Sequence, residues 1–271
     1  MEAVSNIKER NLDLILHSPG GSAEAAESIV TYLRQKFDHI RVFVPLAAMS
    51  AATMIALSAN EIVMGRHSQL GPIDPQFTIF TPEGPRSSPA KAILQQFEKA
   101  KEECRDPANL AAWMPILRSY APGLLTQCQE SQKLAVSMVS DWLKAYMFGG
   151  QPGSDERART IAAWFGDYAN FGSHSRRVGF DELVRIGVVV KRLEDDNELQ
   201  DAVLSVHHAA IHTFSGAAVK LIENQHGRLW ATMVQQLPVM LARPSAPAPS
   251  PQTVQPQGLN RAERRREKRQ S

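Results

Sequence analysis

Two short segments constrain the fold of this chain most, because each joins an apolar run to a run with helical spacing. Residues 17–22 (HSPGGS) follow the apolar run 12–16, and residues 48–52 (AMSAA) follow the apolar run 41–45. Strands that alternate with helices indicate a parallel sheet with right-handed crossovers. The turns that leave neighbouring parallel strands meet at one edge of the sheet, where such folds bind ligands. The sequence therefore predicts that a glycine pair and a serine lie close together.

The rest of the pattern extends this α/β reading along the chain. Ser22 is the expected N-cap of a helix that ends near residue 37, and a third strand is expected at 61–65. A Pro- and Gly-containing loop should run from there to about residue 88. Further helices are expected at 89–148, 155–165, 180–186 and 199–211, with a late strand at 188–190. We expect one domain over 1–242, with a helical insertion at about 95–166, and a tail over 243–271.

Composition excludes several classes of protein. The net charge is only +2, so no global feature demands nucleic acid. The two cysteines, Cys104 and Cys128, are too few for a disulfide framework and wrongly spaced for a zinc site. No stretch approaches the roughly 20 apolar residues that cross a bilayer, and the first residues lack a signal-peptide pattern. The sequence favours a reducing, cytoplasmic location and no transmembrane segment.

The tail has a composition of its own. Four prolines within 244–251 prevent a helix and leave little to pack, so the tail is expected to be disordered. Six basic residues crowd 261–269 beyond it. They could contact nucleic acid or an acidic partner, but a solvated charge run is the simpler interpretation.

Ser50 is the candidate nucleophile. It stands among small residues at a helix start, where its hydroxyl could reach a carbonyl carbon, and Gly20 and Gly21 could offer backbone N–H groups to an oxyanion. Each motif also has a structural reading, since serine is a common N-cap and a glycine pair a common turn. The combination and its spacing favour acyl transfer.

The base that would activate Ser50 is less clear from the sequence. Three histidines of the first half, His17, His39 and His67, have no distinguishing context. His208 and His212 have a spacing that could hold a metal, but no third ligand accompanies them. We read the helical histidines at 207, 208 and 212 as partly exposed and expect no metal and no cofactor.

Lys91 is the other candidate base. It stands at the start of a helix among small apolar residues. Burial and the positive end of a helix both disfavour a protonated lysine, which brings its pKa toward neutrality. Most lysines at helix starts are merely exposed, which is the competing interpretation.

Four segments together resemble the serine dehydrogenase proteinase family: residues 18–21 (SPGG), 48–52 (AMSAA), 59–65 (ANEIVMG) and 70–76 (LGPIDPQ). That family is similar to signal peptide peptidase A and, more distantly, to ClpP and the crotonase fold. The likeness is close over 12–94 and looser over 170–227. It implies a fold of repeated ββα units, hydrolysis of peptide bonds by a serine, and assembly into homo-oligomers.

The resemblance also assigns roles. Ser50 matches the nucleophile, and Gly20 and the N–H of Ala51 match the oxyanion hole, which Gly21 adjoins. ClpP-like enzymes place a histidine where this chain has Asp74, so the resemblance implies that their triad is absent, and Asp74 is read as a brace for its loop. Relatives like signal peptide peptidase use lysine, and Lys91 lies where such a lysine could fall.

Two departures from the relatives keep other functions open. Relatives have a further strand and helix, and often a membrane segment, before the strand at residue 12, and glycines where Ala51 and Ala52 stand. We therefore weigh three hypotheses. The first is an ATP-independent serine peptidase with Ser50 as nucleophile and Lys91 as base. The second is a catalytically idle assembly or binding module, and the third a crotonase-type acyl-CoA enzyme.

Overall fold

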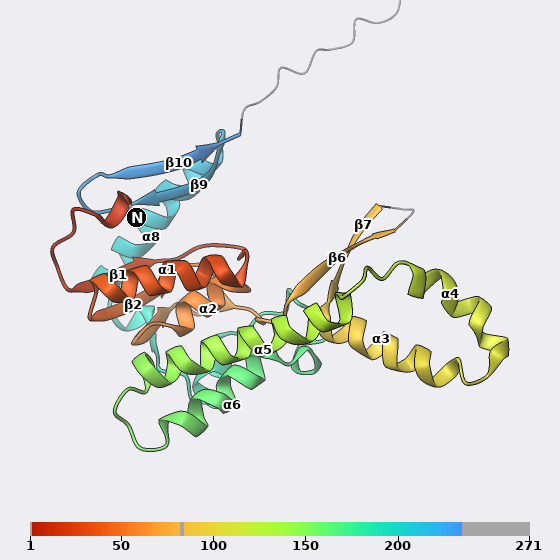
Figure 1. Cartoon of the computed structure of the whole chain (residues 1–271). Coiled ribbons are helices and arrows are strands. Elements are labelled where there is room, and N and C mark those ends of the chain that lie inside the picture. Colours follow the sequence, from red (N-terminus) through yellow and green to blue (C-terminus); the bar gives the residue numbers. More distant parts are fainter. Residues whose placement is uncertain (1, 82–83, 235–271) are drawn as a thin grey trace, which may run out of the picture. The chain divides into compact units, whose positions relative to one another are not determined.

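A four-stranded parallel sheet organises the chain, as the alternating pattern predicts (Figure 1). In this computed structural model residues 2–81 and 84–234 are described, so the predicted tail lies outside the described residues. The strand order is β1-β2-β4-β8, and every neighbouring pair is parallel. The strands are β1 (Asn11–Ile15), β2 (His39–Val44), β4 (Glu61–Met64) and β8 (Val190–Arg192). The α/β class is confirmed.

Helices α1 (Ala23–Lys36) and α2 (Ala51–Leu57) follow β1 and the short strand β3 (Ala47–Ala48). The Ser22 side chain accepts a hydrogen bond from the Ala25 N–H, so the predicted N-cap is confirmed. All but one of the residues of α2 are buried, as expected for a helix of small and apolar residues. Together α1 and α2 place both predicted turns at the carboxyl end of the sheet.

The main core joins the sheet to two helices of the second half. Helices α5 (Leu124–Trp142) and α6 (Ser154–Gly166) bury Val139 and Phe165 in the same cluster as Ile62 and Met64 of β4. A π-helical turn (Leu143–Met147) continues α5. Helix α8 (Asn197–Phe214) packs through a separate small cluster that contains Phe43, Val63, Leu193 and Val203.

The stretch expected as one loop from 65 to 88 contains three strands. They are β5 (Gln69–Leu70), β6 (Gln76–Thr81) and β7 (Gly84–Pro89), and the last two form an antiparallel hairpin. The loop prediction was wrong because the run 76–81 (QFTIFT) is rich in β-branched and aromatic residues, which form a strand despite the prolines and glycines around it. The hairpin leads into α3 (Ala90–Glu103), and Phe77 and Ile79 pack with Ala90 and Ile93.

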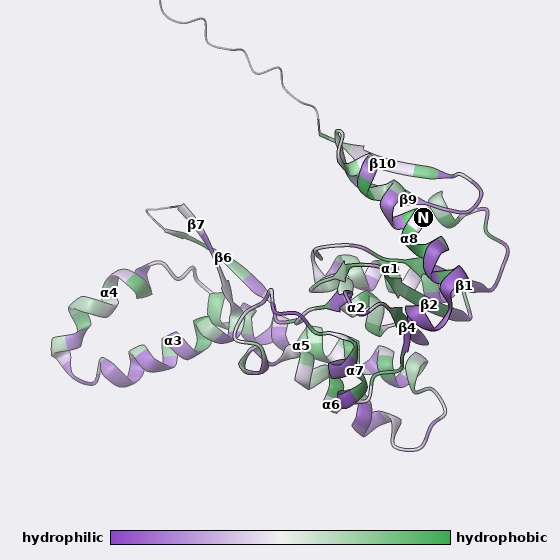
Figure 2. Cartoon of the chain, turned by 180° about the vertical axis from the view of Figure 1, so that it is seen from behind, coloured by the Kyte–Doolittle hydropathy of each residue, from purple (hydrophilic) through white to green (hydrophobic). Residues whose placement is uncertain are grey.

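Helix α4 (Leu110–Arg118) has no buried residue, although it is apolar. Figure 2 shows hydrophilic residues along much of the neighbouring α3.

A second hairpin, β9 (Ala218–Glu223) with β10 (Leu229–Met233), follows α8 and was not predicted. The late strand β8 begins two residues after the predicted start, and α7 (Phe180–Ile186) has the predicted bounds. Within the described residues, no helix has the length and apolarity to span a membrane.

Candidate active site

A short ladder of backbone hydrogen bonds assembles the site from four distant segments. Ser18 pairs with β3, β3 pairs in parallel with β5, and Leu70 of β5 pairs with Val178. The bonds include Ser18 N–H to Ala47 O at 2.9 Å and the reciprocal pair between Leu70 and Val178 at 3.0 and 2.9 Å. Each segment continues directly into a loop, so the ladder gathers the loops around residues 20, 50, 74 and 174.

Ser50 sits at the turn between β3 and α2 in a strained conformation. Its φ of 52° and ψ of −120° make it the one non-glycine residue with positive φ among the described residues. Such geometry costs about 1–3 kcal/mol and persists where surrounding structure fixes it, often at functional sites. The Ser50 side chain makes no capping hydrogen bond, so the structural reading of this serine as an N-cap does not hold.

Gly20 is required by the close approach of its turn to Ser50. Its φ is 105°, and a Cβ placed there would lie 2.6 Å from the Met49 carbonyl oxygen and 2.8 Å from Ser50 Cβ. A side chain at this position would therefore collide with the backbone of the serine turn. Gly21 differs, since a Cβ there would meet nothing within 4 Å. The predicted closeness of the two turns is confirmed at Gly20.

The backbone N–H groups around Ser50 differ in how free they are. The Gly20 N–H donates to Ser18 Oγ at 3.1 Å and is thus already engaged. Within 2–81 and 84–234, no acceptor pairs with the N–H of Gly21 or of Ala51, the first residue of α2. The first N–H groups of a helix commonly stay unpaired and favour negative charge. Ala51 and Gly21 are therefore available to an anionic oxygen.

A histidine 100 residues further along the chain meets the acid that follows β5. His174 Nδ1 lies 2.8 Å from Asp74 Oδ1, and the second oxygen of Asp74 accepts from Gln76 Nε2 at 2.7 Å. The Asp74 side chain is fully buried, whereas that of His174 is 25% exposed. An ionised Asp74 fixes the proton of His174 on Nδ1 and leaves Nε2 as a potential acceptor.

Ser50, Asp74 and His174 line one cavity of about 370 Å³. Ala51 and Gly21 line the same cavity, so two unpaired N–H donors and the serine share it. No hydrogen bond joins Ser50 Oγ to His174 in the part of the chain that is described, a common situation in enzymes without substrate. The remaining walls are largely apolar, with side chains that include Met54, Ile73, Phe77, Leu134 and Ala135.

Lys91 lies in the first turn of α3 and is paired elsewhere. Its ammonium group contacts Asp167 Oδ1 at 2.5 Å, and its side chain is 31% exposed. This contact holds the pKa of Asp167 below its usual value, helped by the Ala169 N–H. Lys91 is not among the residues that line the Ser50 cavity. The structure thus brings together Ser50, Ala51, Gly20 and Gly21, but not Lys91.

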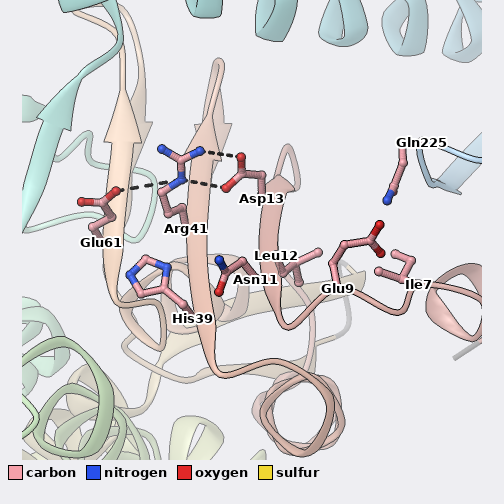
Figure 3. Close-up of a pocket in the computed structure, with 9 residues that line it drawn as sticks. All are labelled: Ile7, Glu9, Asn11, Leu12, Asp13, His39, Arg41, Glu61 and Gln225. Atoms are coloured by element: carbon pink, nitrogen blue, oxygen red, sulfur yellow. Dashed lines mark hydrogen bonds and ion pairs between the residues drawn. The ribbon is translucent and has the colours of Figure 1, made fainter.

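A larger depression of about 690 Å³ lies over the sheet (Figure 3). Arg41 of β2 stands at its centre between two acids of neighbouring strands, with Asp13 Oδ1 at 2.7 Å from Nε and Glu61 Oε1 at 4.0 Å. These three side chains therefore satisfy one another. No group of three or more metal-ligating side chains occurs within the described ranges.

The helical histidines do not behave as one group. His207 is buried, with 7% of its surface exposed, so its reading as a partly exposed residue was wrong. It faces the interior because it lies one turn after the buried Val203 on the same stripe of α8. His208 and His212 are exposed, as expected.

The first part of the chain matches a known protein family. Residues 3–112, which include Gly20, Ser50 and Asp74, match the model of the ClpP-like SDH-type serine proteinase family. This part of the chain is similar to that family. The predicted resemblance is thereby confirmed, and the members of the family are serine proteinases.

Two curated relatives come from Methanocaldococcus jannaschii. The uncharacterized protein MJ0137 is 39% identical over 175 residues, which are 64% of this chain and 54% of that protein. The uncharacterized protein MJ1495 is 37% identical over 95 residues, 35% of this chain and 30% of that protein. The chain therefore spans about half the length of these relatives or less.

Among solved structures, two mutants of the 1510-N membrane-bound stomatin-specific protease are similar. Both are 18% identical to this chain. The first has a TM-score of 0.43 and covers 72% of this chain and 70% of that chain. The second, in complex with a substrate peptide, has a TM-score of 0.40 and covers 69% and 64%. TM-scores this low carry no argument about chemistry.

Sequence reasoning missed His174 altogether and read Asp74 only as a brace. The pair is separated by 100 residues, and nothing near His174 marks it as special. The one available signal was Asp74 itself, because a carboxylate beside the serine turn needs a partner when buried.

Proposed function

We propose that the chain hydrolyses peptide bonds through Ser50, with His174 as the general base and Asp74 as the group that orients His174. The observation that carries the proposal is the cavity that these three side chains share, together with the 2.8 Å contact between Asp74 and His174. The match to a serine proteinase family supports it.

In this mechanism His174 transfers the proton, Asp74 orients His174, and backbone N–H groups bind the oxyanion. His174 Nε2 accepts the proton of the Ser50 hydroxyl as Oγ attacks the substrate carbonyl carbon, and returns it to the leaving amine. A water molecule that gives a proton to the same Nε2 then attacks the acyl carbon, and the acid product leaves as Ser50 Oγ regains its proton. Asp74 stabilises the imidazolium that forms. The N–H groups of Ala51 and Gly21 bind the developing oxyanion, and the loss of one such donor typically costs about 100- to 1000-fold in rate. Gly20 shapes the turn and keeps its own N–H on Ser18.

Lys91 stays the alternative base that the sequence suggested. To act as the base, Lys91 would have to leave Asp167 and move toward Ser50, because the Asp167 carboxylate holds its ammonium group at 2.5 Å. Hydrolysis by either base needs no ATP, so we propose an ATP-independent peptidase that acts on peptide or protein substrates.

A fluorophosphonate probe separates the candidates, because it reacts with an activated serine without needing a known substrate. We expect labelling at Ser50 in the natural chain without nucleotide, none in Ser50→Ala, and labelling slower by about 100- to 10,000-fold in His174→Gln. Lys91→Met should label at nearly the natural rate. The exposed His212→Gln serves as the matched histidine control.

The opposite pattern, with labelling lost in Lys91→Met and kept in His174→Gln, would establish the lysine base. Failure of the natural chain to react at all would favour the idle assembly module. Thioester turnover that survives Ser50→Ala would favour the crotonase-type enzyme.

A further inference from the structure

Helix α8 docks on the rest of the chain through an unexpected residue. Of its 18 residues only Val203 and His207 are buried, and they lie one turn apart on the same stripe. Val203 packs with Phe43, Val63 and Leu193 in an ordinary apolar cluster. An apolar side chain would fill position 207 without giving up the hydration of an ionisable ring. A histidine there makes the docking of α8 sensitive to protonation.

The ring of His207 contacts the turn that carries Gly20. Its centroid lies 5.0 Å from that of His17, with the two planes at 79°, the edge-to-face arrangement that neutral aromatic rings favour. His17 Nδ1 lies 3.1 Å from the carbonyl oxygen of Ala47 in β3. His17, which precedes the Gly20 turn, therefore contacts β3 on one side and α8 on the other.

The other ionisable groups that act on His207 are histidines as well. His208 lies beside it on α8, with ring centroids 5.9 Å apart, and His67 follows β4. Burial lowers the pKa of His207 most, and His17, His208 and His67 lower it further. Within the described residues no carboxylate is among the groups that act on it; Glu194 lies beside His67 at Gly65. A protonated His207 would thus face other imidazoles without a counter-ion.

We propose that His17 and His207 form a positioning pair that holds the Gly20–Gly21 turn against the Ser50 turn while the rings are neutral. As pH falls, protonation of His207 favours the opened contact, in which its imidazolium is hydrated, and the turn loosens. The role of this turn in binding an oxyanion rests on the proposed function. The pair itself touches neither substrate nor reacting atoms, so both are positioning residues.

Amide exchange measured by NMR tests the pair without any need for activity. The reporters are the Ser18 and Met49 N–H groups, which bond across the two turns to Ala47 O and Ser18 O. Corrected for intrinsic exchange, their protection should fall about threefold to tenfold between about pH 7.5 and 5.5 in the natural chain. In His207→Leu, which keeps an apolar contact and cannot be charged, protection should not change with pH. His212→Gln should behave like the natural chain.

Equal protection at both pH values in the natural chain would overturn the proposal, as would an undiminished fall in His207→Leu. Should His207→Leu fail to fold, His17→Phe tests the same pair from the exposed side, because it keeps a ring and removes the electrostatic effect of His17 on His207. It should show a smaller fall, and an unchanged fall would count against the pair.

A second readout connects the pair to Ser50. The rate of fluorophosphonate labelling should fall as the pH is lowered. The midpoint of this fall should lie at a lower pH in His207→Leu than in the natural chain and should be unchanged in His212→Gln. An unchanged midpoint in His207→Leu would contradict the proposal. If the natural chain reacts at no pH, the proposed function fails, while the exchange measurement still decides the fate of the pair.

Discussion

At the scale of single residues, the site depends on two backbone conformations that side chains rarely tolerate. Ser50 has positive φ although it carries a Cβ, and Gly20 lies so close that it cannot carry one. The strain at Ser50 turns its hydroxyl away from the capping role that a serine at this position usually has. The cavity thereby gains a hydroxyl that forms no hydrogen bond in the described part of the chain.

We expect Gly20→Ala to destabilise the chain by about 1–3 kcal/mol, because its Cβ would meet the Met49 carbonyl oxygen and its φ would be strained. Labelling of Ser50 should fall with the displaced turn. Gly21→Ala is the matched control, since its Cβ meets nothing and its N–H remains, and it should change the unfolding free energy by about 0.5 kcal/mol or less. Urea denaturation measures both; equal effects of the two substitutions would contradict this account.

At the scale of elements, the ladder of Ser18, β3, β5 and Val178 matters more than any one helix. Thr53 of α2 ties it together: the buried hydroxyl donates to Ala48 O at 2.7 Å and accepts from the Gly71 N–H at 3.0 Å. The loop that carries Asp74 is thereby fixed to the helix that follows Ser50.

Replacing Thr53 by valine keeps the shape and leaves the Gly71 N–H buried without a partner. We expect a loss of about 1–3 kcal/mol in unfolding free energy. Thr213→Val, which removes a hydroxyl from an exposed position on α8, should have little effect. An unchanged unfolding free energy in Thr53→Val would mean that the ladder does not depend on the hydrogen bond between Gly71 and Thr53.

The ion pair between α3 and the loop after α6 predicts a pH dependence. Because Lys91 lowers the pKa of Asp167, the pair stabilises the fold above the ordinary aspartate pKa and loses this contribution as pH falls through the lowered value. Both side chains are partly exposed, so the gain is about 1 kcal/mol or less. Lys91→Met should therefore lower stability at neutral pH and match the natural chain in thermal unfolding once the pH lies below the lowered pKa of Asp167. A difference that persists in acid would point to lost packing.

Local patterns sufficed to predict most of the central sheet, the first two helices and the bounds of α7. They failed for β6 and β7, where turn-forming residues obscured a strand pair, and for the hairpin β9–β10. The same limit applies to the site: Ser50 and Gly20 belong to neighbouring turns and could be placed together, whereas His174 reaches Asp74 only through the pairing of Leu70 with Val178. That pairing joins segments about a hundred residues apart, and no local pattern encodes it.

At the scale of the whole molecule, stability should be unevenly distributed. Strand β2 and helix α2 are largely buried, whereas α4 buries nothing and exposes Leu110 and Met114 by more than two fifths. Helices with few buried contacts open first. The assembly into homo-oligomers that the family resemblance suggests remains a proposal.

Hydrogen exchange read by mass spectrometry tests this distribution. In dilute, monomeric protein we expect peptides from α4 to exchange fastest among the helices, and those from α2 and β2 slowest. Protection of α4 that rises with protein concentration would indicate that a second copy covers it. Protection as high as that of α2 under monomeric conditions would contradict the uneven distribution.

The most direct test of the central claim is the rate at which a fluorophosphonate labels Ser50, with the labelled residue identified by mass spectrometry. We expect rapid labelling at Ser50 in the natural chain, none in Ser50→Ala, and a loss of about 100-fold or more in a folded His174→Gln. Labelling that is absent in the natural chain, or as fast in His174→Gln as without the substitution, would contradict it.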